Sequence, residues 1–514
     1  MASSSSTGTA QTGAGPATDA AQQTTDPGQH WDARLWGALV VLCGVLFLDG
    51  LDVSMVGVAL PSIGSDLDLS TSALQWVVSG YVLGYGGLLL LGGRFADLLG
   101  RRRVLLAALA VFTLASLVGG LVNDGTLLVI TRFLKGAAAA FTAPASLSYI
   151  TTTFAEGPAR NRALAIYTAC GASGFSLGLV LGGAMTELGW RWTFFLPVPI
   201  AIAILIAAPR VLAKDAPAAA PARRSFDFAG ALTITAAMLL LVRTVVEAPD
   251  AGWGAPATLG GLVAAALLLA AFLAIELRAP QPLVRLGILR SGALVRANLG
   301  MFAVFGAYVS FQFVGTLYLQ SVLGWSAIET ALAFLPGGLI VAFGAPRIGP
   351  LVDRYGTSRV ILAGSLAFVI GYALFLRVGD SFSYPWIFLP TMLLIGTGFA
   401  LSFPALNIQA TAGVPDHEQG LASGLVNTSF QVGGAVVLAI VTAVVSANAG
   451  SGGDAASLLD GLRPAIAVVT GIAAIGLVVA FAGARLAAAR PSPVVAAPVA
   501  IETVPEPLPE REAA

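Results

Sequence analysis

Charged residues are scarce in this chain. Only 11% of its 514 residues are charged, whereas 57% are hydrophobic. A water-soluble protein carries about 25% charged residues. So much apolar surface cannot be hidden in a water-soluble core, but a lipid bilayer solvates it. The formal net charge is zero, so the composition favours no nucleic-acid partner. The scarcity of charge predicts an integral membrane protein.

Cysteine and histidine are almost absent, with two residues of each. Cys43 and Cys170 lie in apolar runs, where an unpaired cysteine behaves as a small hydrophobic residue. His30 and His417 lie in polar segments and form no metal cluster. The chain also lacks an HExxH motif, a GxSxG motif with a triad and a carboxylate–histidine cluster. We therefore expect no metal, no cofactor and no enzymatic activity.

The apolar residues fall into fourteen runs. Each is long enough to cross the ~30 Å hydrocarbon core as a helix, which takes roughly 20 residues. We therefore expect an all-α integral membrane protein with 14 transmembrane helices, the alternatives being thirteen or twelve. The predicted spans are approximately residues 35–62, 73–92, 104–122, 125–150, 162–186, 193–212, 228–247, 257–277, 294–320, 328–349, 359–377, 385–412, 419–446 and 462–484.

Composition predicts the two tails, and the loop repeat described below predicts the division between them. The polar segment 1–31 and the Ala-, Pro- and Glu-rich segment 487–514 are typical of disordered tails. Between them we expect an N-terminal six-helix bundle (32–213), a linker with two extra transmembrane helices (214–293) and a C-terminal six-helix bundle (294–486).

The basic residues predict the orientation. Of the 27 lysines and arginines, 21 lie in the tails and in the loops on one side, and three lie within predicted spans. The opposite side holds only Arg191, Arg377 and Arg463. Because cytoplasmic loops collect Lys and Arg, we expect both termini to be cytoplasmic.

One loop sequence occurs twice. Segments 93–104 and 349–360 carry Gly, Asp, Gly, Arg and Val at the same offsets, each on a predicted cytoplasmic loop. Transporters that work by alternating access are built from two similar halves around a central substrate path. Pairing of Asp97 with an arginine or a helix end would latch that face closed. The alternative is that the arginines only mark topology. The candidate gating residues are Gly93, Asp97, Gly100, Arg101, Arg102 and Asp353.

Ionisable side chains lie deep in two predicted spans, Asp49 and Asp52 in the first, Arg132 and Lys135 in the fourth. A charge in hydrocarbon is costly unless it is paired or hydrated, so each is a functional candidate. A carboxylate whose surroundings alternate between another acid and a basic partner can bind and release a proton. We expect this of Asp52 foremost and of Asp49 second; the alternative is a static Asp52–Arg132 ion pair. Lys135 either shifts the local field or extends to the membrane surface.

Six ordered segments resemble motifs of the major facilitator superfamily, and within it of the fourteen-helix drug:proton antiporters of the EmrB/QacA type. Three are LDVSMVGVALPSI (51–63), GRFADLLGRRRV (93–104) and RFLKGAAAA (132–140); the others are residues 171–183, 190–200 and 420–435. The resemblance covers about residues 32–486 and implies two six-helix bundles plus two inserted helices. It also implies that Asp52 and Arg132 take part in proton coupling. Lys135 stands where the family usually has Gln, and Phe175 and Leu179 replace common prolines.

The fifth span carries a smooth stripe formed by Gly171, Gly174, Gly178 and Gly182. Such a stripe permits close helix contact. It either tunes transport, as the resemblance implies for this antiporter motif, or serves ordinary packing.

Aromatic and amide side chains within the spans are candidate substrate contacts, because aromatic walls with a few amides suit an amphipathic organic ligand. Each of them singly is also a plausible packing residue. The candidates are Trp76, Tyr308, Gln312, Asn407, Asn427 and Gln431, together with Tyr81, Phe311, Phe313 and Gln409.

These features together predict proton-coupled export of small amphipathic compounds (drugs, antibiotics or secondary metabolites) across a bacterial plasma membrane by alternating access. The proton gradient supplies the energy, and the family's usual state is a monomer. The alternative is an uncoupled or proton-symporting transporter of a specific metabolite in the same fold. A receptor or scaffold is disfavoured because the buried charges and the repeated gate would then be idle.

Overall fold

The computed structural model describes residues 31–155, 158–214, 227–279, 282, 286–344, 347–377, 383–414, 419–449 and 455–488. The two predicted tails lie almost entirely outside this part of the chain, as do His30 and His417.

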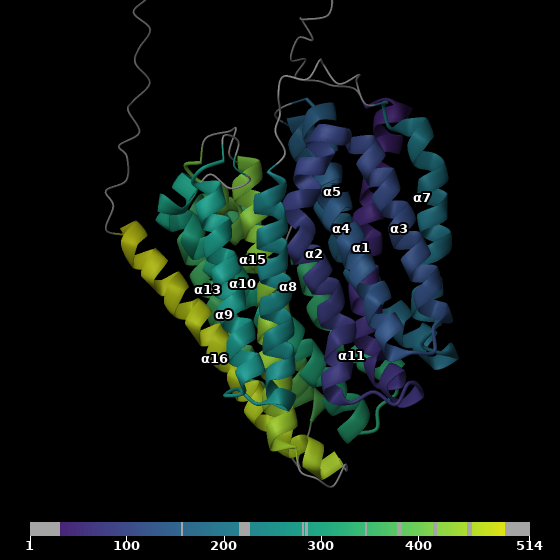
Figure 1. The fold of residues 1–514 in the computed structure, drawn as a ribbon, viewed down its shortest axis with the longest axis vertical. Helices are drawn as coiled ribbons and strands as arrows, with labels where there is room; N and C mark the ends of the chain where they lie inside the picture. Colours follow the sequence, from purple (N-terminus) through teal and green to yellow (C-terminus); the bar gives the residue numbers. More distant parts are fainter. Residues whose placement is uncertain are drawn as a thin grey trace, which may run out of the picture.

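The described residues form helices and no strand (Figure 1), which confirms the all-α fold class. The short elements are a 3₁₀ turn (Leu286–Arg290), α12 (Ile348–Tyr355) and π-helical turns at Tyr318–Val322 and Tyr384–Phe388. The other helices are α1 (Ala33–Asp66), α2 (Thr71–Leu99), α3 (Arg101–Leu121), α4 (Gly125–Thr153), α5 (Pro158–Leu188), α6 (Trp192–Phe195), α7 (Pro197–Val211), α8 (Phe228–Ala251), α9 (Pro256–Glu276), α10 (Gly292–Leu317), α11 (Ala327–Gly344), α13 (Thr357–Phe375), α14 (Leu389–Thr411), α15 (Gln419–Asn448) and α16 (Ala455–Ala488).

Every predicted span overlaps helices of the described residues, although the tenth, 328–349, runs past the end of α11 at Gly344. Within the described residues, 12 helices are long and apolar enough to cross a membrane. Helices α2 and α8, of 29 and 24 residues, are not among those twelve. The chain is thus a multi-pass membrane protein, and the count of fourteen crossings stays a prediction.

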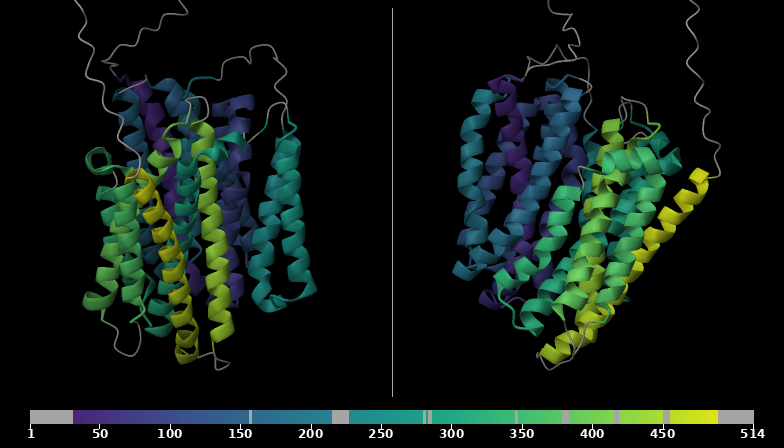
Figure 2. Two further views of the ribbon diagram at one scale, coloured as in Figure 1. Left: turned by 90° about the vertical axis from the view of Figure 1, so that its left-hand side faces the viewer. Right: turned by 180° about the vertical axis from the view of Figure 1, so that it is seen from behind.

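The helices form two groups, which we call the N-terminal half (α1–α7) and the C-terminal half (α10–α16) (Figures 1 and 2). In the first, α5 packs along α1 and α4 packs against α2 and α3. In the second, α15 packs along α10 and α14 packs against α11 and α13. Helices α8 and α9 form a hairpin whose α8 contacts both α2 and α15. The domain boundaries at residues 213, 293 and 486 remain predictions.

Helix α1 begins and α16 ends at the same end of the bundle, the upper end in Figure 1, which we call the terminal end. The repeated loops lie there as well, where α2 passes into α3 and α12 into α13. Gly100 and Gly356 occupy these junctions with φ of 99° and 81°. Because side chains with a Cβ rarely adopt such backbone angles, glycine recurs at this place in both copies.

Candidate functional site

Three charged side chains meet deep inside the N-terminal half. Asp52 of α1 forms ion pairs with both Arg132 and Lys135 of α4, and each cation binds a different carboxylate oxygen. The side chains of Asp52, Arg132 and Lys135 are 0%, 2% and 0% exposed. An unpaired charge at such depth is very costly, so mutual pairing is what keeps the three charges there. Together with Asp49 we call these residues the charge cluster.

Neutral groups also hold the two cations. Arg132 Nε donates to the Val77 carbonyl oxygen of α2 at 2.9 Å, and its guanidinium lies 4.7 Å from the Tyr81 ring centroid. Lys135 Nζ donates to Ser116 Oγ of α3 at 2.8 Å. Charge-assisted hydrogen bonds are the strong ones, so these contacts orient both side chains toward Asp52. Lys135 therefore does not extend to the membrane surface, which was one of its two interpretations from sequence.

Asp49 lies one helical turn from Asp52, toward the terminal end, and its surroundings differ. It is buried, with 7% relative exposure. Its Oδ2 atom accepts no hydrogen bond from any residue that the structure describes. Tyr81, Tyr85 and Lys135 lie within electrostatic range of its carboxyl group. The two acids of α1 thus share a helix face but not their partners.

Glycines bring the helices of the charge cluster together. A Cβ on Gly136 of α4 would come within 2.9 Å of the Tyr81 Cα of α2. The predicted stripe on α5 packs on α1 in the same way: a Cβ on Gly182 would lie 2.6 Å from the Met55 Cα, and one on Gly171 would lie 2.8 Å from the Leu46 side chain. Gly174 and Gly178 approach the α1 backbone as closely. The stripe therefore lets α5 pack closely against α1, the helix that carries Asp49 and Asp52. Its role in tuning transport remains a prediction.

The first copy of the repeated loop ties α3 to its neighbours at the terminal end. Arg101 Nη1 donates to Thr152 Oγ1 of α4 at 2.7 Å, and Arg102 Nη2 donates to the Pro209 carbonyl oxygen of α7 at 2.8 Å. The Asp97 side chain lies outside what the structure describes. Gly93 faces Pro144 of α4, with 3.7 Å between its ideal Cβ position and the Pro144 Cβ.

In the second copy, Asp353 is exposed to solvent. The latch roles of Asp97 and Asp353 stay predictions.

A small cavity lies between the halves, next to the charge cluster. Helices α1, α2, α4 and α10 line it, and its polar wall consists of Tyr81, Arg132 and Gln312. The remaining lining residues are apolar or glycine, among them Val53 and Phe313. Gln312 is 6% exposed, and its Nε2 atom has no hydrogen-bond partner among the described residues. An apolar cavity with a guanidinium and an amide suits an amphipathic organic ligand.

The other substrate candidates lie elsewhere. Asn407 and Asn427 donate to the Phe403 and Ser423 carbonyl oxygens of their own helices, at 2.9 and 3.0 Å. Gln409 donates to the Ala293 carbonyl oxygen at 3.1 Å. None of the remaining candidates lines the cavity either: Trp76, Tyr308, Phe311 and Gln431. Tyr308 instead bridges the halves, with ring centroids 5.9 Å from Phe175 of α5 and 5.1 Å from Phe399 of α14.

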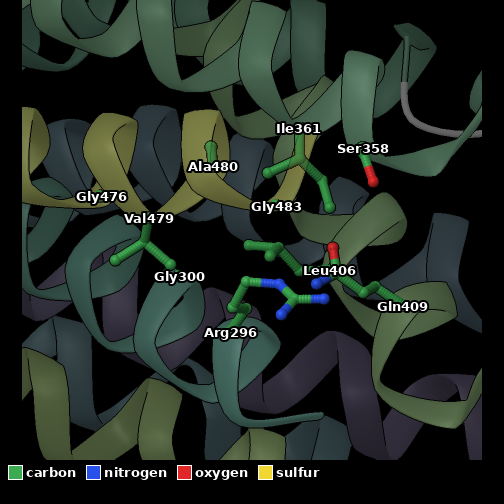
Figure 3. A pocket seen from close by; sticks show the side chains of 10 residues that line it. All are labelled: Arg296, Gly300, Ser358, Ile361, Leu406, Gln409, Gly476, Val479, Ala480 and Gly483. Atoms are coloured by element: carbon green, nitrogen blue, oxygen red, sulfur yellow. The ribbon is translucent and has the colours of Figure 1, made fainter. Parts of the chain in front are cut away.

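A second small pocket lies at the terminal end of the C-terminal half, between α10, α13, α14 and α16 (Figure 3). Arg296 and Gln409 face each other across it, and Ser358 lies at its rim. Ser358 occupies the position in the second loop copy that Arg102 occupies in the first. The sequence analysis did not predict this pocket. The replacement of an arginine in the first loop copy by a serine in the second could have indicated it.

The halves contact each other in the middle and at the end away from the termini. Gln320 of the π-helical turn after α10 donates to the Val58 carbonyl oxygen of α1 at 3.0 Å. A Cβ on Gly183 of α5 would come within 2.8 Å of the Ile328 Cα of α11. At mid-height, a Cβ on Gly86 of α2 would lie 2.8 Å from the Gln431 Cβ of α15.

Comparison with known protein families and proteins points to one group. The family described as Major Facilitator Superfamily matches residues 42–438. The chain is 36% identical over 477 residues to the puromycin resistance protein pur8 of Streptomyces alboniger, covering 91% of each chain. It is 40% identical over 425 residues to the cephamycin export protein CmcT of Amycolatopsis lactamdurans, covering 82% of this chain and 87% of that relative.

Among solved structures, the fold is similar to that of the POT family transporter PepTSo. The TM-score is 0.65 over 89% of this chain and 98% of the other, at 16% sequence identity. At this identity the likeness shows the fold alone.

Proposed function

Because the chain belongs to the major facilitator superfamily, we propose that it exports small amphipathic compounds across a bacterial plasma membrane in exchange for protons, by alternating access. Members of this family carry small organic substrates across membranes, and the chain is a transporter, not an enzyme. The compounds proposed are antibiotics or other secondary metabolites, moved by a monomer whose energy source is the proton gradient.

Two relatives support the direction of transport. One is named for resistance to puromycin and the other for export of cephamycin, and both align over more than four fifths of this chain. Puromycin and a cephamycin are therefore the first compounds to test.

The observation that carries the coupling proposal is the charge cluster beside the central cavity. Four ionisable groups persist in the N-terminal half although each is costly to hold within a membrane. Arg132 belongs to both the cluster and the cavity wall. A substrate that enters the cavity therefore meets a guanidinium whose partner is a carboxylate, and binding there can change how firmly the cluster holds a proton.

In the proposed cycle the two halves move relative to each other as rigid bodies. Their contacts at the end away from the termini describe one arrangement, and opening there with closure at the terminal end would give the other. We place the terminal end in the cytoplasm because the basic loops lie there.

The test is export in an antibiotic-sensitive bacterial host that lacks its own pumps. We expect the full chain to lower susceptibility to puromycin or a cephamycin, and everted vesicles to accumulate the same compound when an imposed pH gradient is present. A proton ionophore should abolish the accumulation. Entry that ignores the ionophore and stops at equal concentrations on both sides would favour the uncoupled alternative, and uptake into intact cells would favour symport.

A further inference from the structure

The two acids of α1 stand in unequal surroundings, and this inequality assigns them different tasks. We propose that Asp49 carries the exchanged proton, whereas Asp52 stays ionised through the cycle as the fixed counter-charge of Arg132 and Lys135. The inference rests on the proposed proton coupling and reverses the order of importance expected from sequence.

Asp52 is unsuited to exchange a proton because both of its oxygens are engaged. One accepts from Arg132 and the other from Lys135, and all three side chains are at most 2% exposed. A proton on Asp52 would leave two buried cations without their partner. Removing one member of a buried ion pair is strongly destabilising, because the remaining charges stay buried without their partner.

Asp49 can bind a proton without breaking any contact of this kind. Its Oδ2 atom has no hydrogen-bond partner among the described residues. It is also the least buried member of the charge cluster, at 7% against at most 2% for the others. It lies on the side of Asp52 nearer the terminal end, where a proton would exchange with the cytoplasm.

The groups that face Asp49 from the packed helices support both of its charge states. Three tyrosines lie within electrostatic range of its carboxyl group, Tyr81 and Tyr85 of α2 and Tyr167 of α5. Lys135 of α4 and Asp52 of its own helix supply one charge of each sign. With Asp49 ionised, the two acids balance Arg132 and Lys135. With Asp49 protonated, the charge cluster carries one net positive charge, and no ion pair has changed.

The proposed cycle releases one proton from Asp49 and binds one proton to it. The Asp49 carboxyl group gives its proton to water on the cytoplasmic side when substrate enters, and takes one from the outer side after substrate leaves. No bond other than O–H forms or breaks.

Infrared difference spectroscopy of the reconstituted full-length protein tests the assignment without any substrate. Between about pH 5 and about pH 9, where perturbed carboxyl groups titrate, we expect the carbonyl stretch of a protonated carboxyl group to appear and vanish. The band should disappear in Asp49→Asn and persist in Asp52→Asn/Lys135→Met, which keeps the buried charges balanced. Persistence in Asp49→Asn with loss in the double variant would overturn the assignment, as would the lack of any such band in the wild-type protein.

Transport of puromycin in the same liposomes separates this inference from the proposed function. For one-for-one electroneutral exchange, a gradient of about one pH unit supports about tenfold accumulation. We expect Asp49→Asn to reduce this to no accumulation while puromycin exchange across the membrane continues, and Asp49→Glu to restore it. Asp49→Asn with wild-type accumulation would sink the assignment and leave proton coupling intact. A wild-type protein that ignores the pH gradient would refute the proposed function itself.

Discussion

The two halves of the molecule share a scaffold but differ in what fills their centres. In the N-terminal half, α5 packs on α1 through Gly174, which abuts the Phe47 backbone. In the C-terminal half, α15 packs on α10 through Gly433, which abuts the Phe302 backbone in the same manner. The same solution to close helix packing thus occurs twice.

What lies beside these contacts is not repeated. The N-terminal half buries the charge cluster, whereas the C-terminal half buries a group of aromatic rings around Phe311. The Phe311 ring lies 5.1 Å from Phe375 and 5.4 Å from Tyr372, and Phe334 lies 5.4 Å from Phe388. Carboxylate and amine groups can bind and release protons, whereas phenylalanine rings have no group that does so. Under the proposed function, the N-terminal half holds the groups that bind and release protons, and the C-terminal half contributes packed aromatic rings.

Breaking the charge cluster should have the largest effect. Asp52→Asn leaves Arg132 and Lys135 buried without their ion-pair partner, and we expect it to destabilise the protein by about 3–5 kcal/mol. Thermal unfolding of the purified protein in detergent measures this loss. Asp52→Asn/Lys135→Met is the matched control and should recover most of the stability. An Asp52→Asn protein as stable as the wild type would mean that the ion pairs contribute little.

Substitution of the glycine at the repeated helix contact should lower stability by a similar amount in both halves. The loss should be smaller than that caused by Asp52→Asn. Gly174→Val and Gly433→Val each force a side chain against the backbone of the neighbouring helix, so we expect each to cost about 1–3 kcal/mol. Gly471→Ala in α16, where an added Cβ meets nothing within 4 Å, is the control. The measurement is again thermal unfolding. A loss confined to one half would show that the two packing contacts are not equivalent.

The smallest expected effect comes from substitutions at equivalent positions of the two loop copies. Arg102→Ala removes the hydrogen bond to the Pro209 carbonyl oxygen, and for this partly exposed group we expect a loss of about 1 kcal/mol with slower export. Ser358→Ala changes the equivalent position of the other half and should leave export unchanged. Initial rates of puromycin efflux compare the two variants. Equal rates for Arg102→Ala and the wild type would reduce the first copy to a mark of topology.

Sequence reasoning placed the helices and the members of the charge cluster, but not their contacts. Lys135 was left between two interpretations, because a lysine in an apolar span can reach outward or inward. The structure resolves this through Ser116 of α3, whose position relative to α4 no local pattern encodes. Of ten aromatic and amide candidates for substrate contact, only Tyr81, Gln312 and Phe313 line the central cavity. Which face of a helix meets the cavity depends on how the halves pack, and spacing along one chain does not specify it.

The sequence by itself determined that this chain crosses a membrane as helices and repeats a loop in two halves. The reason is local: in hydrocarbon each backbone N–H and C=O group must find its partner within the same helix, so a long apolar run has one stable conformation. Only the tertiary structure decided which acid is paired. Asp49 and Asp52 stand one turn apart on α1, in similar sequence surroundings. Their difference comes from Arg132 and Lys135, which lie 80 and 83 residues beyond Asp52 and reach that acid because close packing between helices sets the register of α4.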